Sequence, residues 1–371
     1  MTAASGEART YYPPPESEGG WRWLKGPEEV RSIGGMDPDR LQFACEWNAL
    51  YSSSSEVVII RHGYLVTEWY ENHTLTPTRF DIWSCTKSFT GTAYGVLFED
   101  SQLDKLSSDK RVDLDSFVYP LIPEGYPLSD PRKEQITFRH LLSMTSGIPG
   151  QRSGVYGLPT EIGVGPFEAA LGCAPVKARR WPTERWASQL SAEPGTQWDY
   201  SDPAMAHLAL AFYHVTGREI SEFMQERVFD PIGIESLSWD MQGVGAEFIG
   251  PHTNAHTGIH ICARELARFG YLMLRNGVWD GRQIVAPWWI EVATQTSQEF
   301  NPNYGYTWWV NTQGIQWPGV PRDAFAAMGH LCNRCYVIPS LDLVVVRIGS
   351  GPASWEEPVF IEKVVDAVIA D

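Results

Sequence analysis

Runs of apolar residues near the two ends of the chain have the pattern of β-strands. SEVVII (55–60) and YLVTEWY (64–70) are rich in β-branched and aromatic residues, and the short Arg-His-Gly segment between them predicts a hairpin. FAAMGHL (325–331), RCYVIP (334–339) and LDLVVVRIG (341–349) predict three more short strands.

Between these strands, apolar residues recur at helical spacing. Asp37 followed by Pro38 is a helix-start signal, and an apolar stripe without proline runs from Ser84 to about Glu99. Further helices are predicted for ITFRHLLSM (136–144), AMAHLALAFYHV (204–215), ARELARFGYLMLRNG (263–277) and PVFIEKVVDAVIA (358–370).

This order of elements predicts an α+β or α/β core with a helical insertion, because both ends of the chain supply strands to the sheet. The predicted divisions are an irregular N-terminal arm at 1–29, a core made of 30–105 and 216–371, and an inserted, mainly helical lobe at 106–215.

Composition limits the partners. The 371 residues carry a formal net charge of −16, which repels phosphate backbones, so no nucleic-acid partner is expected. The longest apolar runs fall below the ~18 residues of a bilayer span, so no membrane partner is expected either.

The first residues lack a secretory signal, which predicts a cytoplasmic protein as written, or a periplasmic or secreted one if a signal was removed. No cofactor is expected, and six cysteines are too few for a disulfide scaffold.

Candidate chemistry begins with Ser84 and Lys87, three residues apart in DIWSCTKSFTG. That spacing puts both side chains on one helical face, and burial favours the neutral amine, which can take the hydroxyl proton. Backbone N–H groups at the helix start can stabilise an oxyanion. An N-cap serine beside a snorkelling lysine also fits the pattern. Ser107 and Lys110 repeat the spacing in a polar segment, which predicts a solvated loop.

Two later segments add to this pattern. Tyr200 follows a glycine-containing turn, and a phenol held beside Lys87 can act as a general base, although a packing role before a helix also fits. Gly329, His330 and Leu331 lie on a predicted late strand that ends near a turn, from which a backbone N–H can reach a bound carbonyl.

Together and in this order, the three motifs resemble those of the serine β-lactamase and penicillin-binding-protein superfamily, especially its class-C-like branch of esterases, peptidases and β-lactamases. FRHLLSMTSGIPG (138–150) resembles its Leu-Leu-x-x-Thr-Ser-Gly segment, PGTQWDYSD (194–202) its Pro-Gly-x-x-x-x-Tyr-Ser-Asn segment, and ARELARFG (263–270) its Asp-Leu-Ala-Arg-Phe-Gly helix. The resemblance implies a β-lactamase-like α+β fold, in which an antiparallel sheet built from both termini is flanked by helices and the site lies between the lobes.

Carried over position by position, the resemblance implies that Ser84 is the nucleophile, that Lys87 helps to deprotonate it, and that Tyr200 is the base that later protonates the leaving group. The backbone N–H groups of Ser84 and Asn333 would form the oxyanion hole. The family's third motif, Lys or His, then Thr or Ser, then Gly, falls on the expected substrate-binding residues His330, Leu331 and Cys332.

Two departures from the family pattern bear on the substrate. Asp202 stands where the branch has Asn, and an ionised carboxylate accepts hydrogen bonds but cannot donate them. Near Lys87 it would hold the lysine charged, shift the base role toward Tyr200 and favour substrates that offer N–H or cationic groups. Leu331 and Cys332 replace a hydroxyl and a glycine, which predicts a bulkier, more apolar rim. Both departures weigh against efficient β-lactam hydrolysis.

Other clusters have more ordinary interpretations. His252, His256 and His260 have the spacing of metal ligands on a helix, but nearby Pro251 and Gly258 argue against a helix, so rim loops without a metal are expected. Buried thiols are expected at Cys85, Cys332 and Cys335. Core positions or cleft walls are expected for Trp288, Trp289, Trp308 and Trp309. A charged loop, either solvated or a site for a carboxylate, gathers Lys177, Arg179, Arg180 and Arg185.

The sequence therefore predicts covalent acyl transfer, in which an ester or amide acylates Ser84 and water or another nucleophile releases the acyl group. Hydrolysis of a carboxylic ester is the first prediction. The alternatives are transfer to an alcohol or amine in a biosynthetic pathway, activity as a β-lactamase or peptidase, an acylation-trapped sensor, and a metal- or thiol-dependent protein.

Overall fold

A six-stranded antiparallel sheet, of order β10-β11-β12-β13-β1-β2, forms the centre of the protein. The computed structural model describes residues 10–51, 54–70, 78–151, 171, 189–242 and 251–369. The strands of the sheet are β1 (Ser54–Arg61), β2 (Tyr64–Tyr70), β10 (Trp309–Val310), β11 (Phe325–Gly329), β12 (Asn333–Ile338) and β13 (Leu343–Ser350). The two ends of the chain meet in this sheet, because β1 pairs along its whole length with β13.

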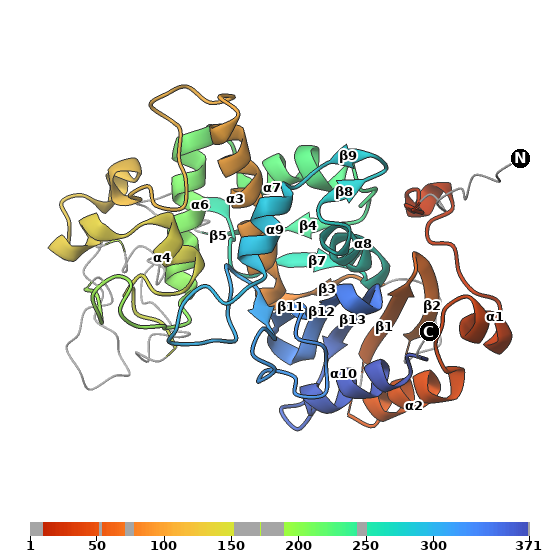
Figure 1. Cartoon of the computed structure of the whole chain (residues 1–371). Coiled ribbons are helices and arrows are strands. Elements are labelled where there is room, and N and C mark those ends of the chain that lie inside the picture. The colour runs from red at the N-terminus through yellow and green to blue at the C-terminus, as the bar shows by residue number, and fades with distance from the viewer. Residues whose placement is uncertain are drawn as a thin grey trace, which may run out of the picture.

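Helices cover both faces of the sheet, with α8 on one side and α2 and α10 on the other (Figure 1). The α-helices in the described residues are α1 (Pro27–Ser32), α2 (Pro38–Ala49), α3 (Thr86–Gln102), α4 (Phe138–Leu142), α6 (Asp202–Thr216), α7 (Ile220–Met224), α8 (Ala263–Leu274), α9 (Pro287–Ala293) and α10 (Glu357–Asp366). None of these described helices combines the length and the apolar character that a bilayer span requires.

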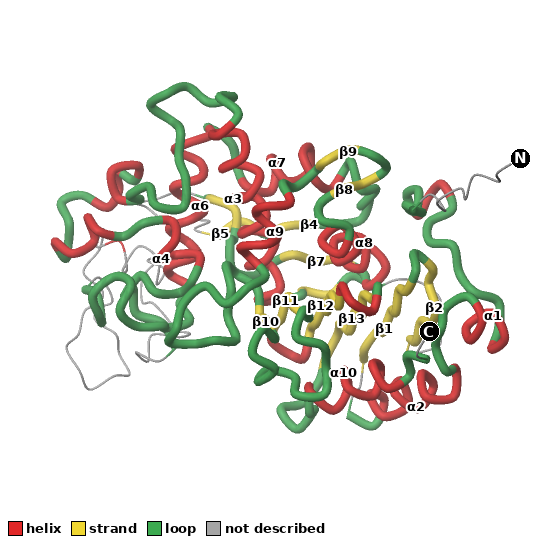
Figure 2. Tube along the Cα trace, viewed as in Figure 1, coloured by secondary structure: helices red, strands yellow, loops and turns green. Residues whose placement is uncertain are grey.

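Shorter elements complete the fold, and Figure 2 shows how much loop separates them. The short strands are β3 (Phe80–Asp81), β4 (Ser238–Trp239), β5 (Met241–Gln242), β6 (His252–Thr253), β7 (Ile259–Ile261), β8 (Val278–Trp279) and β9 (Arg282–Gln283). The 3₁₀ turns are Glu16–Glu18, Trp83–Cys85, Tyr119–Leu121, Pro123–Gly125, Pro131–Gln135, His330–Cys332 and Pro339–Leu341, and one π-helical turn is Gln225–Phe229.

Both faces of the sheet are buried, which explains why its strands are continuous apolar runs rather than alternating ones. On β1, Val57 and Ile59 pack into the cluster under α2 and α10, whereas Val58 and Ile60 pack into the cluster that contains α3 and α8. In the second cluster, the rings of Phe89 on α3 and Phe269 on α8 stack with centroids 3.8 Å apart. Helix α3 is thereby held against α8, one of the helices that cover the sheet (Figure 1).

The predicted α+β arrangement and most of the predicted elements are confirmed. Asp37 caps α2 and accepts hydrogen bonds from the two following backbone N–H groups at 2.9 and 3.2 Å. The hairpin of β1 and β2 turns at His62 and Gly63, whose φ angles are 53° and 73°. One predicted strand is too long, because β11 ends at Gly329 and the chain then enters a 3₁₀ turn.

Candidate active site

Ser84 and Lys87 meet where the 3₁₀ turn Trp83–Cys85 leads into α3. The Lys87 side chain is 1% exposed, and its Nζ donates a hydrogen bond to Ser84 Oγ at 2.8 Å. The same Nζ donates to the backbone carbonyl of His256 at 3.1 Å. An ammonium fixed by two acceptors therefore lies directly against the hydroxyl.

Asp202 completes an ion pair with Lys87. It is the first residue of α6, and its Oδ1 lies 2.7 Å from Lys87 Nζ. Burial raises the pKa of Asp202, but the Lys87 ammonium outweighs that effect and holds the pKa of the carboxyl below its usual value. The Asp202 carboxyl is therefore ionised at neutral pH, and its side chain is 19% exposed.

The ring of Tyr200 also lies against the lysine. Lys87 Nζ is 4.8 Å from the centroid of that ring, which is a cation–π contact. The ring also lies 6.1 to 6.2 Å from the rings of Trp198, Tyr304 and Trp309, measured between centroids. The backbone carbonyl of Tyr200 accepts a hydrogen bond from the N–H of Gln151 at 2.9 Å. The structure thus brings Ser84, Lys87, Tyr200 and Asp202 together.

His256 is a member of this site that the motifs did not single out. Besides accepting from Lys87 through its carbonyl, it places its ring close enough to interact with Asp202 and Lys87, and burial lowers its pKa to about 4. The ring is therefore neutral at pH 7. The only sequence signal for this residue is the series of three histidines spaced four apart, which predicts rim loops without a metal.

The other two histidines of that series have separate partners. His252 Nδ1 lies 2.9 Å from Glu219, and His260 Nε2 lies 3.1 Å from Asp240. Both residues lie on short strands rather than on a helix. Within the described segments, no three His, Cys, Asp or Glu side chains come together as metal ligands do.

The third motif lies in a turn, and not on a strand as predicted. Leu331 and Cys332 have left-handed φ angles of 56° and 67°, each of which costs a residue with a side chain roughly 1–2 kcal/mol. His330 is exposed, with the edge of its ring against Trp83 at 5.3 Å between centroids. Cys332 Sγ points to the carbonyl of Pro352 at 3.6 Å and packs with the cluster of α2 and α10, so its thiol does not face Ser84.

The backbone N–H of Asn333, which is predicted to form part of the oxyanion hole, takes part in a hydrogen bond within the turn itself. The backbone N–H of Asn333 donates to the carbonyl of His330 and closes the turn. The Asn333 carbonyl accepts from Cys85 Sγ at 3.4 Å, next to the candidate nucleophile. Gly329 allows the end of β11 to lie close to the backbone that precedes Ser84, because a Cβ on residue 329 would lie 2.1 Å from the carbonyl oxygen of Ile82.

The remaining candidates lie apart from this centre. Ser107 is exposed, and Lys110 Nζ donates instead to the carbonyl of His214 at 2.8 Å. Cys85 and Cys335 are fully buried, and burial raises the pKa of the Cys85 thiol to about 12. Two of the paired tryptophans, Trp289 and Trp308, belong to the core, whereas Trp309 lies beside Tyr200. The predicted charged loop lies outside the described residues and contains Lys177, Arg179, Arg180 and Arg185.

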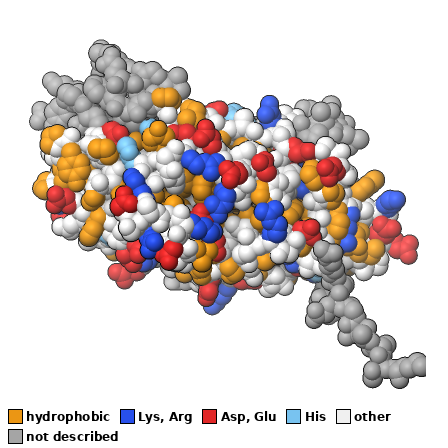
Figure 3. Space-filling view, turned by 90° about the horizontal axis from the view of Figure 1, so that it is seen from above, with side chains coloured by type: hydrophobic (Ala, Val, Ile, Leu, Met, Phe, Trp, Pro, Cys, Tyr) orange, Lys and Arg blue, Asp and Glu red, His pale blue; other side chains and the backbone are white. Residues whose placement is uncertain are grey.

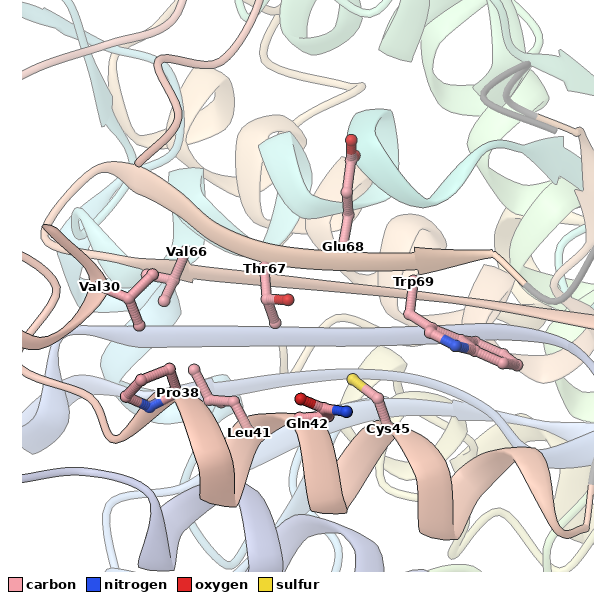
Figure 4. Close-up of a pocket in the computed structure, with 9 residues that line it drawn as sticks. All are labelled: Val30, Pro38, Leu41, Gln42, Cys45, Val66, Thr67, Glu68 and Trp69. Carbon is pink, nitrogen blue, oxygen red and sulfur yellow. The ribbon is translucent and has the colours of Figure 1, made fainter. Parts of the chain in front are cut away.

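A cavity of about 280 Å³ lies between α2 and the edge strand β2 (Figure 4). It is lined by Val30, Pro38, Leu41, Gln42, Cys45, Val66, Thr67, Glu68 and Trp69. None of the candidate catalytic residues contributes to it. On the face seen in Figure 3, acidic and basic side chains interleave with apolar ones, without a broad field of one sign.

The first turn of α6, which carries Asp202, is supported by the buried His207. Its Nδ1 donates to the carbonyl of Pro203 at 2.7 Å, so its Nε2 accepts from the Tyr119 hydroxyl at 2.8 Å. Burial, assisted by Lys133, lowers the pKa of His207 to about 3. The folded protein therefore keeps the His207 ring neutral at pH values at which the unfolded chain protonates it, below about pH 6.5.

We expect this histidine to make folding stability depend on pH. Because its pKa is lower in the folded state, its contribution to stability is complete above pH 6.5 and falls by about 1.4 kcal/mol per pH unit as the pH drops toward 3. Chemical denaturation at pH 7, 6 and 5 measures the slope. His207→Gln should reduce the slope by about that amount, and an unchanged slope would contradict the assignment.

Comparisons with known proteins identify relatives of the whole site-bearing region. The model of the Beta-lactamase family matches residues 53–355. The 6-aminohexanoate-dimer hydrolase of Paenarthrobacter ureafaciens is 23% identical over 328 residues, which are 81% of this chain and 72% of that protein. Lovastatin esterase of Penicillium rubens is 33% identical over 108 residues, 29% of this chain and 25% of that protein. The solved structure of EstCE1, a hydrolase with promiscuous acyltransferase activity, is similar with a TM-score of 0.65 and 17% identity, over 90% of this chain and 98% of that one.

Proposed function

Because this chain belongs to the Beta-lactamase family, we propose that it is a serine hydrolase that forms a covalent acyl-enzyme at Ser84 and hydrolyses a carboxylic ester or a related acyl donor. The observation that carries the proposal is the contact of 2.8 Å between Lys87 Nζ and Ser84 Oγ, with Asp202 and Tyr200 around the same ammonium. A serine with its hydroxyl held in this way is placed for nucleophilic attack.

In the proposed reaction, Ser84 Oγ forms a bond to the acyl carbon, and its proton passes to the phenolate oxygen of Tyr200. The tetrahedral intermediate then breaks the bond to the leaving group, which takes the proton from Tyr200. Water repeats the sequence and releases the carboxylic acid. Because Asp202 holds Lys87 charged, the lysine acts as a fixed cation that stabilises negative charge on Tyr200 and Ser84 rather than as the base.

Asp202 also bears on the class of substrate. Oδ1 lies 2.7 Å from Lys87 Nζ, and the side chain is 19% exposed. A carboxylate at this position repels carbonyl oxygens and attracts N–H groups or cations. We therefore propose acyl donors that present an N–H or ammonium group beside the scissile carbonyl.

An acyl acceptor other than water is the second candidate outcome. The partly exposed rings of Trp198 and Trp309 beside Tyr200 offer an apolar surface to an incoming alcohol or amine, which favours transfer over hydrolysis. The relative EstCE1 combines hydrolase and acyltransferase activity. Turnover of a β-lactam or a peptide, and stable acylation without turnover, remain outcomes of the same test.

The test combines turnover with mass spectrometry. The protein is incubated with a chromogenic short-chain ester, an amide and a β-lactam, with and without an alcohol acceptor, and then quenched in acid and digested with trypsin. Cleavage after Arg79 and Lys87 isolates Ser84 in peptide 80–87, whereas Ser107 lies in peptide 106–110. We expect ester turnover and an acyl mass on peptide 80–87. Turnover abolished by a chelator or a thiol reagent, with peptide 80–87 unmodified, would refute the proposal.

A further inference from the structure

Two arginines, Arg347 fully buried and Arg334 with its side chain 12% exposed, support the turn between β11 and β12, and the proposed mechanism does not use them. Arg334 on β12 and Arg347 on β13 are opposite one another in the register, so their side chains lie on the same face of the sheet. Both guanidinium groups lie within 6 Å of the ring centroid of Trp355, at 5.7 and 5.4 Å. This face is the one covered by α2 and α10, opposite the face that packs on α3.

Arg347 binds the centre of the turn. Its side chain is fully buried, and its Nη1 donates to the carbonyls of Leu331 at 2.9 Å and of Cys332 at 3.3 Å. Its Nε donates to Asn48 Oδ1 at 3.2 Å, and its Nη2 donates to the carbonyl of Ser350 at 2.5 Å. The guanidinium is therefore held in place from both sides while it binds the two left-handed residues.

Arg334 binds the two ends of the same turn. Its Nη1 donates to the carbonyls of Gly329 at 2.6 Å and of Asn333 at 2.8 Å, while its Nη2 pairs with Glu357 at 3.0 Å. The carbonyl of His330 accepts from the side chain of Asn333 at 2.6 Å. Each of the five carbonyls from 329 to 333 thus accepts a hydrogen bond from a side chain.

The direction of these carbonyls fixes the direction of the N–H groups. In a planar trans peptide the C=O and the following N–H point to opposite sides. Because the carbonyls of Leu331 and Cys332 accept from Arg347, the N–H groups of Cys332 and Asn333 point away from that guanidinium. The Asn333 N–H donates to the His330 carbonyl within the turn, so the Cys332 N–H is the candidate donor to a bound acyl group. Strained left-handed residues persist only where the surroundings hold them, and the two arginines provide that support.

We propose that Arg334 and Arg347 are positioning residues that hold the turn so that the backbone N–H of Cys332 faces the reacting acyl group. This inference rests on the proposed function of Ser84. The two arginines do not touch the substrate, and they act through the backbone of residues 329–333. We expect the two arginines to affect how well the oxyanion is stabilised. That stabilisation occurs in the transition state, so it affects the rate of the reaction rather than the binding of substrate.

The first experiment separates kcat from KM. Arg347→Met keeps the length of the side chain but removes its donors, and we expect kcat per folded molecule to fall at least about 10-fold with KM changed less than about 3-fold. Arg347→Lys retains a charge but not the planar fork of donors. It serves if the methionine variant does not fold, and a smaller loss of kcat is expected.

The matched control is Arg268→Met. Arg268 on α8 is equally buried and donates to the backbone carbonyls of Pro13 and Ile232, away from the turn. Equal kcat losses in the Arg347 and Arg268 variants, or none in either, would overturn the proposal.

The second experiment needs no turnover. In a Leu331→Gly/Cys332→Gly background the turn adopts its left-handed angles without strain and requires less support. Arg347→Met should therefore shift the denaturation midpoint less in this background than in the natural chain. Equal shifts in both backgrounds would show that Arg347 does not support the turn. If the protein turns over no ester or amide, this comparison of two backgrounds still shows whether Arg347 supports the turn, independently of the proposed function.

Discussion

Ser84→Ala is expected to reduce ester turnover by roughly 10⁴- to 10⁶-fold, the loss seen when the nucleophile of a covalent mechanism is removed. The folded structure should change little, because Ser84 Oγ accepts one hydrogen bond from Lys87 and lies in a half-buried turn. The measurement is the initial rate with the chromogenic ester, together with the mass of peptide 80–87 after an acid quench.

The chain supplies its own control for this variant. Ser107→Ala removes a serine with the same spacing to a lysine, but Ser107 is exposed and Lys110 donates to His214 instead. Its turnover should equal that of the natural chain. If Ser84→Ala kept more than about a tenth of the activity, the hydroxyl would not be the nucleophile and the proposed reaction would fail.

Lys87→Met is expected to lower kcat/KM by about 10³-fold, within the range observed for the loss of acid–base assistance. It also leaves the Asp202 carboxylate without its cation. Breaking one half of a buried ion pair costs up to 3–5 kcal/mol, and the partial exposure of Asp202 places the expected destabilisation at the lower end, about 3 kcal/mol. Activity and stability should therefore fall together in this variant.

A second substitution separates the two losses. Asp202→Asn in the Lys87→Met background removes the unpaired charge, so stability should recover while turnover stays low. Urea denaturation and ester kinetics on the same preparations measure both quantities. Recovery of turnover in the double variant would mean that Lys87 only neutralises Asp202 and has no part in the chemistry.

The sequence predicted the sheet and the helices well where the apolar pattern is regular. Strands β1 and β13 and helix α8 follow runs whose apolar residues are buried, and α2 follows the same pattern except for the exposed Phe43. The Beta-lactamase family membership implied by the motifs is confirmed by the family model. Within the site, Ser84 and Lys87 are three residues apart, so helical geometry alone predicts that their side chains can meet.

The turn after β11 was not predictable in the same way. Left-handed residues are usually signalled by Gly or Asn, whereas Leu331 and Cys332 continue the apolar pattern of the strand, so the strand was predicted two residues too long. The contact of His256 with Lys87 depends on a loop between short strands, for which no periodic signal exists. A charged residue inside an otherwise apolar strand, Arg347 in LDLVVVRIG, was the one sign of buried polar contacts at the turn.

The pairing of β1 with β13 has a consequence for the synthesis of this protein. β1 emerges from the ribosome near the beginning of translation, but its central partner is made only when almost the whole chain has been completed, on the order of tens of seconds later. During that interval an apolar strand has one edge without a neighbour, which is a template for aggregation. Nascent chains released before residue 343 should therefore be insoluble or bound by chaperones, whereas chains that include β13 can close the sheet.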